Sequence, residues 1–263
     1  MLTFFRRIRL RLINQAMSDK VRKSLFGDGA TSKYILYAIG EIALVVIGIL
    51  IALQVNNWNE HRKQQLEEQV ILQSLREEIS ENQQTLQAAA LRAENVRKAC
   101  LSILPHIGPS EPLITKAESD SLMRFMTARI TAEVSQSILN DLLVSGRIHL
   151  IQNNELKQQL TAWVSIYTDE ILEEQGYIIH FTQNQIIPFL IEKYSFATEE
   201  TKREIGHESS FEMDHREIYR STKFENLVLN KEINYISLID SYEKVVAYNK
   251  ILLDAIAREL NSE

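Results

Sequence analysis

Histidines, carboxylates and one cysteine are the side chains of this sequence most able to do chemistry, and they form no recognisable site. None of the six histidines is spaced as H-x-x-x-H or H-E-x-x-H, the helical patterns that bind zinc. The nearest approach to a ligand cluster is formed by His207, Glu208, Asp214, His215 and Glu217. These residues fall in a polar stretch, where charged side chains are usually solvated. We therefore predict no metal site and no cofactor.

Motifs for nucleophilic catalysis and phosphate binding are also absent from the sequence. It contains no G-x-S-x-G elbow, no P-loop and no G-x-G-x-x-G. The cysteine, Cys100, falls on an apolar helical seam, where a free cysteine packs as a small hydrophobe. We interpret Glu77, Glu78 and Glu81 as a solvent-facing surface of the same helix. We therefore expect no catalytic residues and no enzymatic activity.

One carboxylate, Glu41, lies inside a strongly apolar stretch. A carboxylate near the middle of a bilayer costs about 2.5–3.5 kcal/mol on insertion scales, so such residues usually face protein or water. Gly48 and Ala52 lie within about 40° of Glu41 on a helical wheel, and small residues four apart allow two helices to approach closely. We predict a face for lateral association, with Glu41 protonated or hydrogen-bonded to a partner helix. Alternatively, Glu41 reaches the nearby membrane edge and the small residues have no role.

The apolar stretch, YILYAIGEIALVVIGILIAL at 34–53, predicts one membrane-spanning helix. Twenty residues at 1.5 Å each span about 30 Å, the thickness of the hydrocarbon core. Residues 1–33 carry a net charge of +6, and the rest of the chain carries −12. Basic residues before the span predict a cytoplasmic N-terminus and the acidic bulk across the membrane. A cleaved signal peptide would have a shorter apolar region followed by small residues, so we predict a signal anchor.

The N-terminal arm has an apolar side and a basic side. Arg6, Arg7, Arg9 and Arg11 lie outside the arc that holds the apolar residues. Such a segment can lie on the membrane surface with its arginines at anionic head groups. The alternative is that these charges only set the topology. Nucleic-acid binding is not expected from an arm that is short, tethered and apolar on one side.

The long segment after the span has a helical seam. There is no Pro or Gly from Glu60 to Leu104, and apolar residues keep a 4-3 spacing from Leu72 to Ile103 with Asn82 among them. A similar seam near the C-terminus is expected to contain Tyr235, Ile239, Tyr242, Val246, Asn249, Leu253, Ile256 and Leu260. Asn82 and Asn249 are seam polar residues that can fix the register of packed helices, or are solvated positions at its edge.

The span motif YAIGEIALVVIGILIALQVNNWNE at 37–60 resembles an uncharacterised family of bacterial single-pass membrane proteins that carry a domain of unknown function. The FFRRIR start and the LLVSGRIHLIQNNEL segment contribute to the resemblance. It implies a membrane-anchored, extracytoplasmic helical domain. No catalytic or binding residues follow from it.

The sequence predicts an all-α fold, in which a single transmembrane helix continues into a long helix and is followed by an antiparallel extracytoplasmic helical bundle. Eight glycines and four prolines among 263 residues argue against β-rich folds, and a hydrophobic content of 45% argues against global disorder. Thr115-x-x-Glu118 predicts a capping box, Gly146 a helix end and Asn153 or Asn154 the next cap. The expected segments are a basic arm at 1–33, a transmembrane helix at 34–54, a heptad-patterned helix at 55–104, a Pro-rich loop at 105–117 and a bundle at 118–263.

Two long seams, small residues in the span and the missing catalytic motifs favour a membrane-anchored scaffold or accessory protein. We expect it in the bacterial inner membrane, with a periplasmic C-terminal domain. Its partners would be the lipid bilayer and a second copy or another membrane protein, with no nucleic acid. The alternative is a sensory or ligand-binding helical bundle, which a polar pocket between helices would favour. An enzyme of unknown type comes third.

Overall fold

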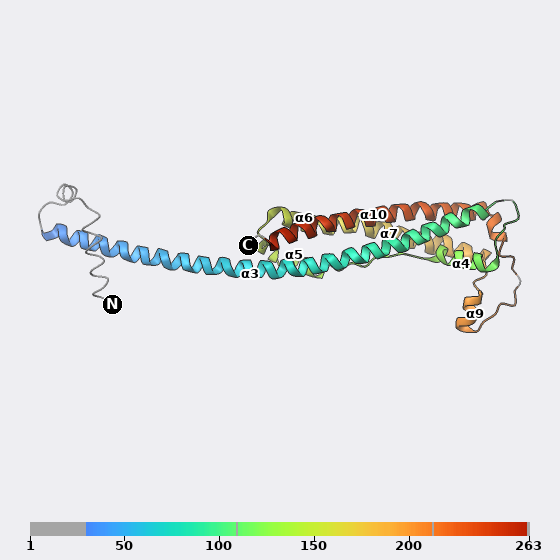
Figure 1. Ribbon diagram of the computed structural model, residues 1–263, viewed down its shortest axis with the longest axis horizontal. Coiled ribbons are helices and arrows are strands. Elements are labelled where there is room, and N and C mark those ends of the chain that lie inside the picture. Colours follow the sequence, from blue (N-terminus) through green and yellow to red (C-terminus); the bar gives the residue numbers. More distant parts are fainter. Residues whose placement is uncertain (1–29, 109, 212, 262–263) are drawn as a thin grey trace. The chain divides into compact units, whose positions relative to one another are not determined.

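The computed structural model describes residues 30–108, 110–211 and 213–261, and these ranges contain helices and loops without a β-strand (Figure 1). The prediction of an all-α fold is therefore confirmed. The chain divides into two compact units between Leu66 and Glu67. The basic arm with Arg6, Arg7, Arg9 and Arg11 lies outside the described residues.

Helix α3 (Ala30–Ile103) is 74 residues long and belongs to both units. The apolar segment lies in the first unit, where none of its most hydrophobic window is buried. With a mean hydropathy of 2.5 in that window, this helix is long and apolar enough to cross a membrane. It ends at Ile103 because Pro105 follows in a short 3₁₀ turn, η1 (Leu104–His106), and cannot continue the backbone hydrogen bonding.

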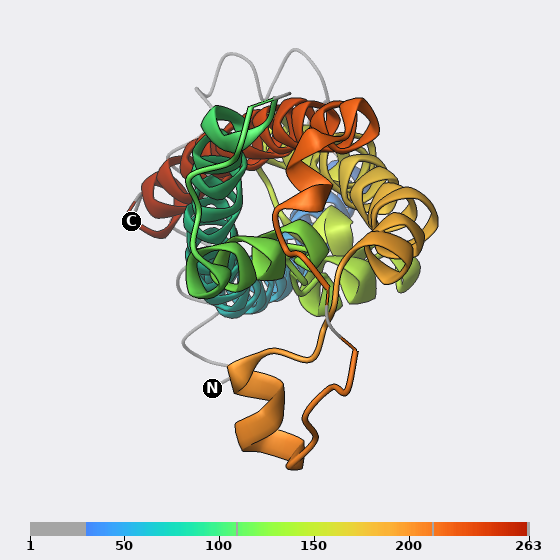
Figure 2. The same ribbon diagram turned by 90° about the vertical axis from the view of Figure 1, so that its right-hand side faces the viewer.

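The second unit is a bundle in which the chain runs along its length four times (Figures 1 and 2). The part of α3 from Glu67 onward forms the first pass, so most of the helix predicted at 55–104 belongs to the same unit as residues 118–263. The second pass is interrupted: α4 (Lys116–Thr127) is followed by nine non-helical residues, 128–136, and by α5 (Ser137–Val144). We call residues 128–136 the strap.

The third pass is continuous helix with two π-helical segments. Its members are α6 (Asn154–Tyr167), η3 (Thr168–Leu172), α7 (Glu173–Phe181), η4 (Thr182–Ile186) and α8 (Ile187–Lys193). Pro188 sits in the first turn of α8, directly after η4. The helix therefore continues through the proline, because the wider turn before it accommodates the missing N–H.

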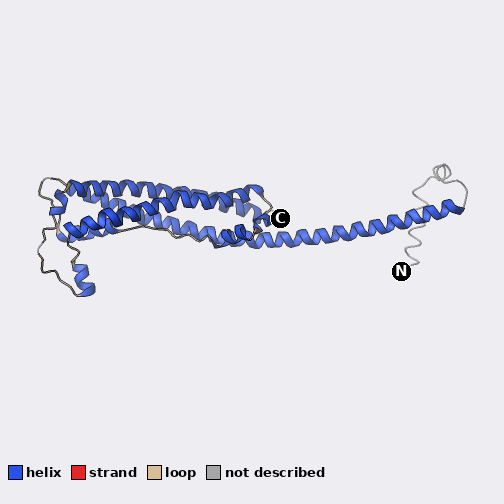
Figure 3. Cartoon of the chain, turned by 180° about the vertical axis from the view of Figure 1, so that it is seen from behind, coloured by secondary structure: helices blue, strands red, loops and turns tan. Residues whose placement is uncertain are grey.

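Helix α10 (Thr222–Leu260) makes the fourth pass and returns antiparallel to the third. Short elements complete the fold: η2 (Arg147–Leu150) after α5, α9 (Glu199–Ile205), and η5 (Glu217–Arg220) before α10. Helix α9 projects from the bundle (Figure 2). The view from behind shows the same arrangement of helices (Figure 3).

The predicted local signals are confirmed. The Thr115 hydroxyl accepts a hydrogen bond from the Glu118 N–H at 3.3 Å, and the Glu118 carboxylate accepts one from the Thr115 N–H at 2.9 Å. The bonds that the Thr115 N–H and hydroxyl donate to this carboxylate lower the pKa of Glu118. Gly146 follows α5 with φ +72°, and the Asn153 side chain caps α6 through the Leu156 N–H at 3.0 Å.

The seam predicted on α3 is buried at all ten positions from Leu72 to Ile103. The seam predicted on α10 is fully buried at every second position, Tyr235, Tyr242, Asn249 and Ile256. The alternate positions, Ile239, Val246, Leu253 and Leu260, are partly buried and pack against the core. The apolar residues directly before the first three of these, Leu238, Val245 and Leu252, are more deeply buried.

The strap exists because α4 and α5 bury faces that a continuous helix would not align. Met123 and Met126 of α4 are buried, as are Leu139 and Leu142 of α5. Thirteen residues separate Met126 from Leu139, so an unbroken helix would place them about 140° apart around its axis. The non-helical strap corrects this rotation, although residues 128–136 contain no glycine or proline.

Candidate functional site

Buried polar side chains are the chemically distinctive feature of the bundle, and four of the nine hydrogen-bond to the strap. Among the described residues the buried polar or charged ones are Glu68, Glu78, Asn82, Ser119, Gln175, Thr182, Lys231, Ser241 and Asn249. A buried polar group is costly unless it is hydrogen-bonded. The partners of these groups therefore show what each one does.

Lys231 and Tyr235, one turn apart on α10, hold the start of the strap. The Lys231 ammonium donates to the Ala128 carbonyl at 2.9 Å and to the Thr182 hydroxyl at 3.5 Å. The Tyr235 hydroxyl donates to the same Ala128 carbonyl at 3.1 Å and accepts from the Ile130 N–H at 3.3 Å. Both side chains thus bind backbone groups that have no helix or sheet to pair with.

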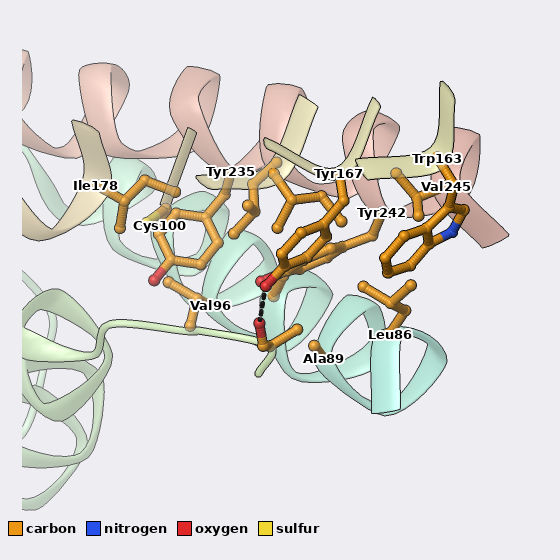
Figure 4. Close-up of a cluster of buried hydrophobic side chains, with 14 of the residues drawn as sticks. Leu86, Ala89, Val96, Cys100, Trp163, Tyr167, Ile178, Tyr235, Tyr242 and Val245 are labelled. Atoms are coloured by element: carbon orange, nitrogen blue, oxygen red, sulfur yellow. Dashed lines mark hydrogen bonds between the residues drawn. The ribbon is translucent and has the colours of Figure 1, made fainter. Parts of the chain in front are cut away.

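Two side chains of the third pass hold the middle of the strap. The Tyr167 hydroxyl donates to the Ala132 carbonyl at 3.3 Å, the bond drawn in Figure 4. The Gln175 amide donates to the same carbonyl at 3.4 Å and to the Tyr242 hydroxyl at 3.3 Å. The strap is therefore connected to the third and fourth passes at once.

Helix α3 holds the end of the strap and the start of α5. Asn82 makes two bonds with the backbone of Ser135, donating to its carbonyl at 2.7 Å and accepting from its N–H at 2.8 Å. The Glu78 carboxylate accepts from the Ser135 hydroxyl at 2.6 Å and from the N–H groups of Ile138 and Leu139 at 3.1 and 3.4 Å. Glu78 therefore supplies the negative cap that α5 lacks locally.

The interpretation of three glutamates as one solvent face was wrong for Glu78. It is buried, whereas Glu77 and Glu81 are exposed. Glu68, ten residues earlier on α3, makes a comparable contact, in which its carboxylate accepts from the Gln152 N–H at 2.6 Å. Sequence reasoning missed both residues because an acidic residue on a long polar helix is usually solvated. The signal for both was their position in the sequence: Glu78 directly precedes the seam residue Ile79, and Glu68 lies four residues, about one helical turn, before Leu72.

Burial sets the electrostatics of Lys231. Its side chain is 1% exposed, and among the described residues no carboxylate forms an ion pair with it. The pKa of Lys231 is lowered to about 8, chiefly by burial; Cys100 opposes the shift, and Arg129 adds a smaller contribution to it. Burial likewise raises the pKa of the Cys100 thiol to about 11 and that of Tyr235 to about 12. Cys100 is therefore an unreactive thiol packed in the core, as Figure 4 shows.

The two predicted seam asparagines are both buried, and they have different partners. Asn82 binds the strap, as described above. Asn249 accepts a hydrogen bond from the indole N–H of Trp163 at 2.6 Å, and its own Nδ2 has no hydrogen-bond partner. The bond between Trp163 and Asn249 therefore links α6 and α10 within the core. Trp163 also stacks on Tyr167 of α6, at 5.6 Å between ring centroids.

A second polar cluster fastens the loop end of the bundle. Ser119 of α4 lies within hydrogen-bonding distance of two tyrosine hydroxyls, Tyr219 at 2.9 Å and Tyr194 at 3.0 Å. Tyr194 also donates to Asp120, which pairs with Lys116. Burial raises the pKa of Tyr219 to about 12 and that of Tyr194 further still. These neutral hydroxyls join α4 to the segments before α9 and α10.

The predicted membrane face lies in the first unit. Glu41, Gly48 and Ala52 are exposed on α3. A methyl group built on Gly48 would meet no atom within 4 Å, so the small residues leave open space beside the helix.

The histidine-rich polar stretch does not assemble a metal site in the part of the chain that the structure describes. His215 lies 3.1 Å from the Ile114 carbonyl, and Asp214 pairs with Arg216 at 2.9 Å. The Arg216 guanidinium holds the pKa of Asp214 below its usual value. These residues anchor a loop.

An open groove of about 640 Å³ lies between α3 and α10, away from the strap. Its lining residues are Gln83, Gln87, Ala90, Glu243, Val246, Ala247, Lys250, Leu253 and Asp254. Neither Lys231 nor Cys100 is among them. The side chains with altered pKa values therefore do not line this groove.

Comparison with known proteins yields one match. The model of a family of unknown function (DUF6090) matches residues 41–105, which include most of α3. The expected resemblance to an uncharacterised family is confirmed over this part of the chain. No curated protein and no solved structure matches the sequence.

Proposed function

We propose that this protein is a membrane-anchored helical scaffold or accessory subunit that acts through helix–helix association and has no catalytic activity of its own. The observation that carries the proposal is the use of the buried polar groups. Lys231, Tyr235, Gln175, Asn82 and Glu78 all bind backbone of the same chain. A catalytic group instead needs a substrate cleft beside it.

The membrane anchor follows from the exposed apolar part of α3. Apolar side chains cover this helix on all sides, and a bilayer is the environment that accommodates such a surface. From the basic N-terminal residues we propose a cytoplasmic N-terminus and a periplasmic bundle, anchored once in the inner membrane of a bacterium. Reporter fusions at the two ends test this topology, and activity of the same reporter at both ends would contradict it.

Association is proposed to run through Glu41, Gly48 and Ala52. The experiment is crosslinking in native membranes, followed by identification of the species that co-purify. Ala52→Leu adds bulk to the proposed face, and Ala43→Leu adds the same bulk on the opposite side of the helix, about 160° away. We expect Ala52→Leu to reduce the crosslinked complex and Ala43→Leu to leave it intact. A chain that remains monomeric without a partner, or two variants with equal effects, would refute the scaffold function.

The groove between α3 and α10 favours one alternative, a sensory or ligand-binding bundle. Its lining mixes apolar residues with Gln83, Glu243 and Lys250, and the Gln83 Oε1 atom is buried without a partner. A small amphiphilic metabolite that raises the melting temperature of the wild type but not of Lys250→Met would support this alternative. If no metabolite in a panel shifts the melting temperature in this way, the ligand-binding alternative is rejected and the scaffold function stands.

A further inference from the structure

We propose that the strap, residues 128–136, is a releasable clasp, which detaches from the bundle as a unit while α3, the α6–α8 helix and α10 remain packed together. The inference is independent of the proposed function. It concerns how the second pass of the chain is held.

The conformation of the strap is imposed from outside its own sequence. It contains no glycine or proline, and no residue in it has a positive φ. No backbone–backbone hydrogen bond joins residues 129–135 to another element of the described structure. Its backbone partners are side chains from α3, α6, α7 and α10. The local sequence therefore gives the strap little stability of its own.

The strap also contributes little to the apolar core. Ala132 is its one buried apolar residue, and Ile130 and Val134 are only partly buried. Removing the strap from the bundle therefore exposes little hydrocarbon from the strap itself, in contrast with the long helices. Regions with few buried apolar contacts open at a lower free-energy cost than the core.

The groups left behind by an opened strap are ones that water can satisfy. Lys231, Tyr235, Tyr167, Gln175 and Asn82 each exchange a backbone partner for solvent on release. Rehydrating polar groups offsets much of the loss of their bonds, because the net value of such a bond in water is small. Release therefore uncovers a row of polar and aromatic side chains without stranding a buried charge.

Contacts that do not involve the strap keep the other passes together. Trp163 binds Asn249 across α6 and α10, and Tyr248 donates to the Gln159 carbonyl across the same two helices. Arg97 of α3 pairs with Glu232 of α10 at 3.4 Å. The apolar seam of α3 and the buried apolar residues of α10 belong to the same core cluster, which does not depend on the polar contacts of the strap.

The test is hydrogen exchange resolved to single amides in the full-length protein held in lipid nanodiscs. The Ile130 and Ser135 amides, which bind Tyr235 and Asn82, report on the strap, and amides near Tyr242 report on α10. We expect the strap amides to exchange at least about tenfold faster than those of α10, and to respond weakly to low concentrations of denaturant. Equal rates with equal denaturant dependence would overturn the proposal, as would strap amides that exchange without any protection.

A matched pair of variants identifies the cause. Tyr167→Phe removes the bond to the Ala132 carbonyl of the strap, and Tyr248→Phe removes an equivalent bond to the Gln159 carbonyl of α6. We expect Tyr167→Phe to speed the exchange of both strap amides by about two- to tenfold while α10 stays unchanged. Tyr248→Phe should leave the strap unaffected. A Tyr167→Phe variant that alters α10 and the strap equally, or alters neither, would refute independent release.

Discussion

Lys231→Met is expected to stabilise the protein at neutral pH. The folded state lowers the pKa of Lys231 from 10.5 to about 8, which corresponds to roughly 3 kcal/mol of free energy spent in burying the charge. Methionine has a similar length and carries no charge. Its loss of the bond to Ala128 costs about 1 kcal/mol, and the Ala128 carbonyl keeps its bond from Tyr235. The free energy of unfolding should therefore rise by about 2 kcal/mol.

The gain should depend on pH in a defined window. Between pH 8 and 10.5 the unfolded chain keeps the Lys231 proton and the folded chain loses it, so the wild type gains stability as the pH rises. Below pH 8 both states are protonated, and the difference between variant and wild type is constant. The advantage of Lys231→Met should therefore shrink above pH 8. Tyrosines, which titrate in the alkaline range, are present in both proteins and cancel in the difference. Cys100 does not cancel fully, because Lys231 lowers its pKa and Lys231→Met removes that effect.

The assay is denaturant unfolding of the full-length protein in nanodiscs, followed by the fluorescence of buried Trp163. Lys250→Met, an exposed substitution on the same helix, is the control and should change stability by less than about 0.5 kcal/mol. A Lys231→Met variant that is less stable than the wild type, or whose advantage is the same at pH 7 and pH 10, would refute the reasoning.

Two further substitutions test the packing of α3, each against a neighbour on the same helix and by the same unfolding assay. Glu78→Ala should lower the free energy of unfolding by about 1–3 kcal/mol because it leaves the start of α5 without its cap, whereas exposed Glu77→Ala should have little effect; equal effects would contradict the cap. Leu86→Ala should cost about 2–5 kcal/mol, since this side chain is fully buried, and Leu91→Ala, at a 65% exposed position, should cost far less; similar losses would show that the seam does not face the core.

Periodicity predicted the buried face of α3 because several seam residues, such as Leu75, Leu86 and Val96, stand between polar neighbours and so fix the register. On α10 the apolar residues come in adjacent pairs, such as Leu238 with Ile239 and Val245 with Val246. A 4-3 spacing fits either member of each pair. The packing of the third pass against α10 selects the first member, and this information is not in the local pattern.

The strap could not be predicted from helix-breaking residues, because it contains no glycine or proline. Its one signal was the mismatch in rotation between the apolar faces of α4 and α5. The polar partners were harder still to predict. Glu78 and Lys231 resemble surface residues by type, and only the neighbouring segments that need hydrogen bonds explain why they are buried.

The arrangement of the strap also has a consequence for the order of folding. Its partners lie far away in the chain: Asn82 is 53 residues before Ser135, and Tyr235 is 107 residues after Ala128. No single helix supplies the strap with a template, so it can dock only after the first, third and fourth passes have come together. During synthesis, the chain therefore carries this segment unpaired until α10 has emerged, and the second pass is completed last.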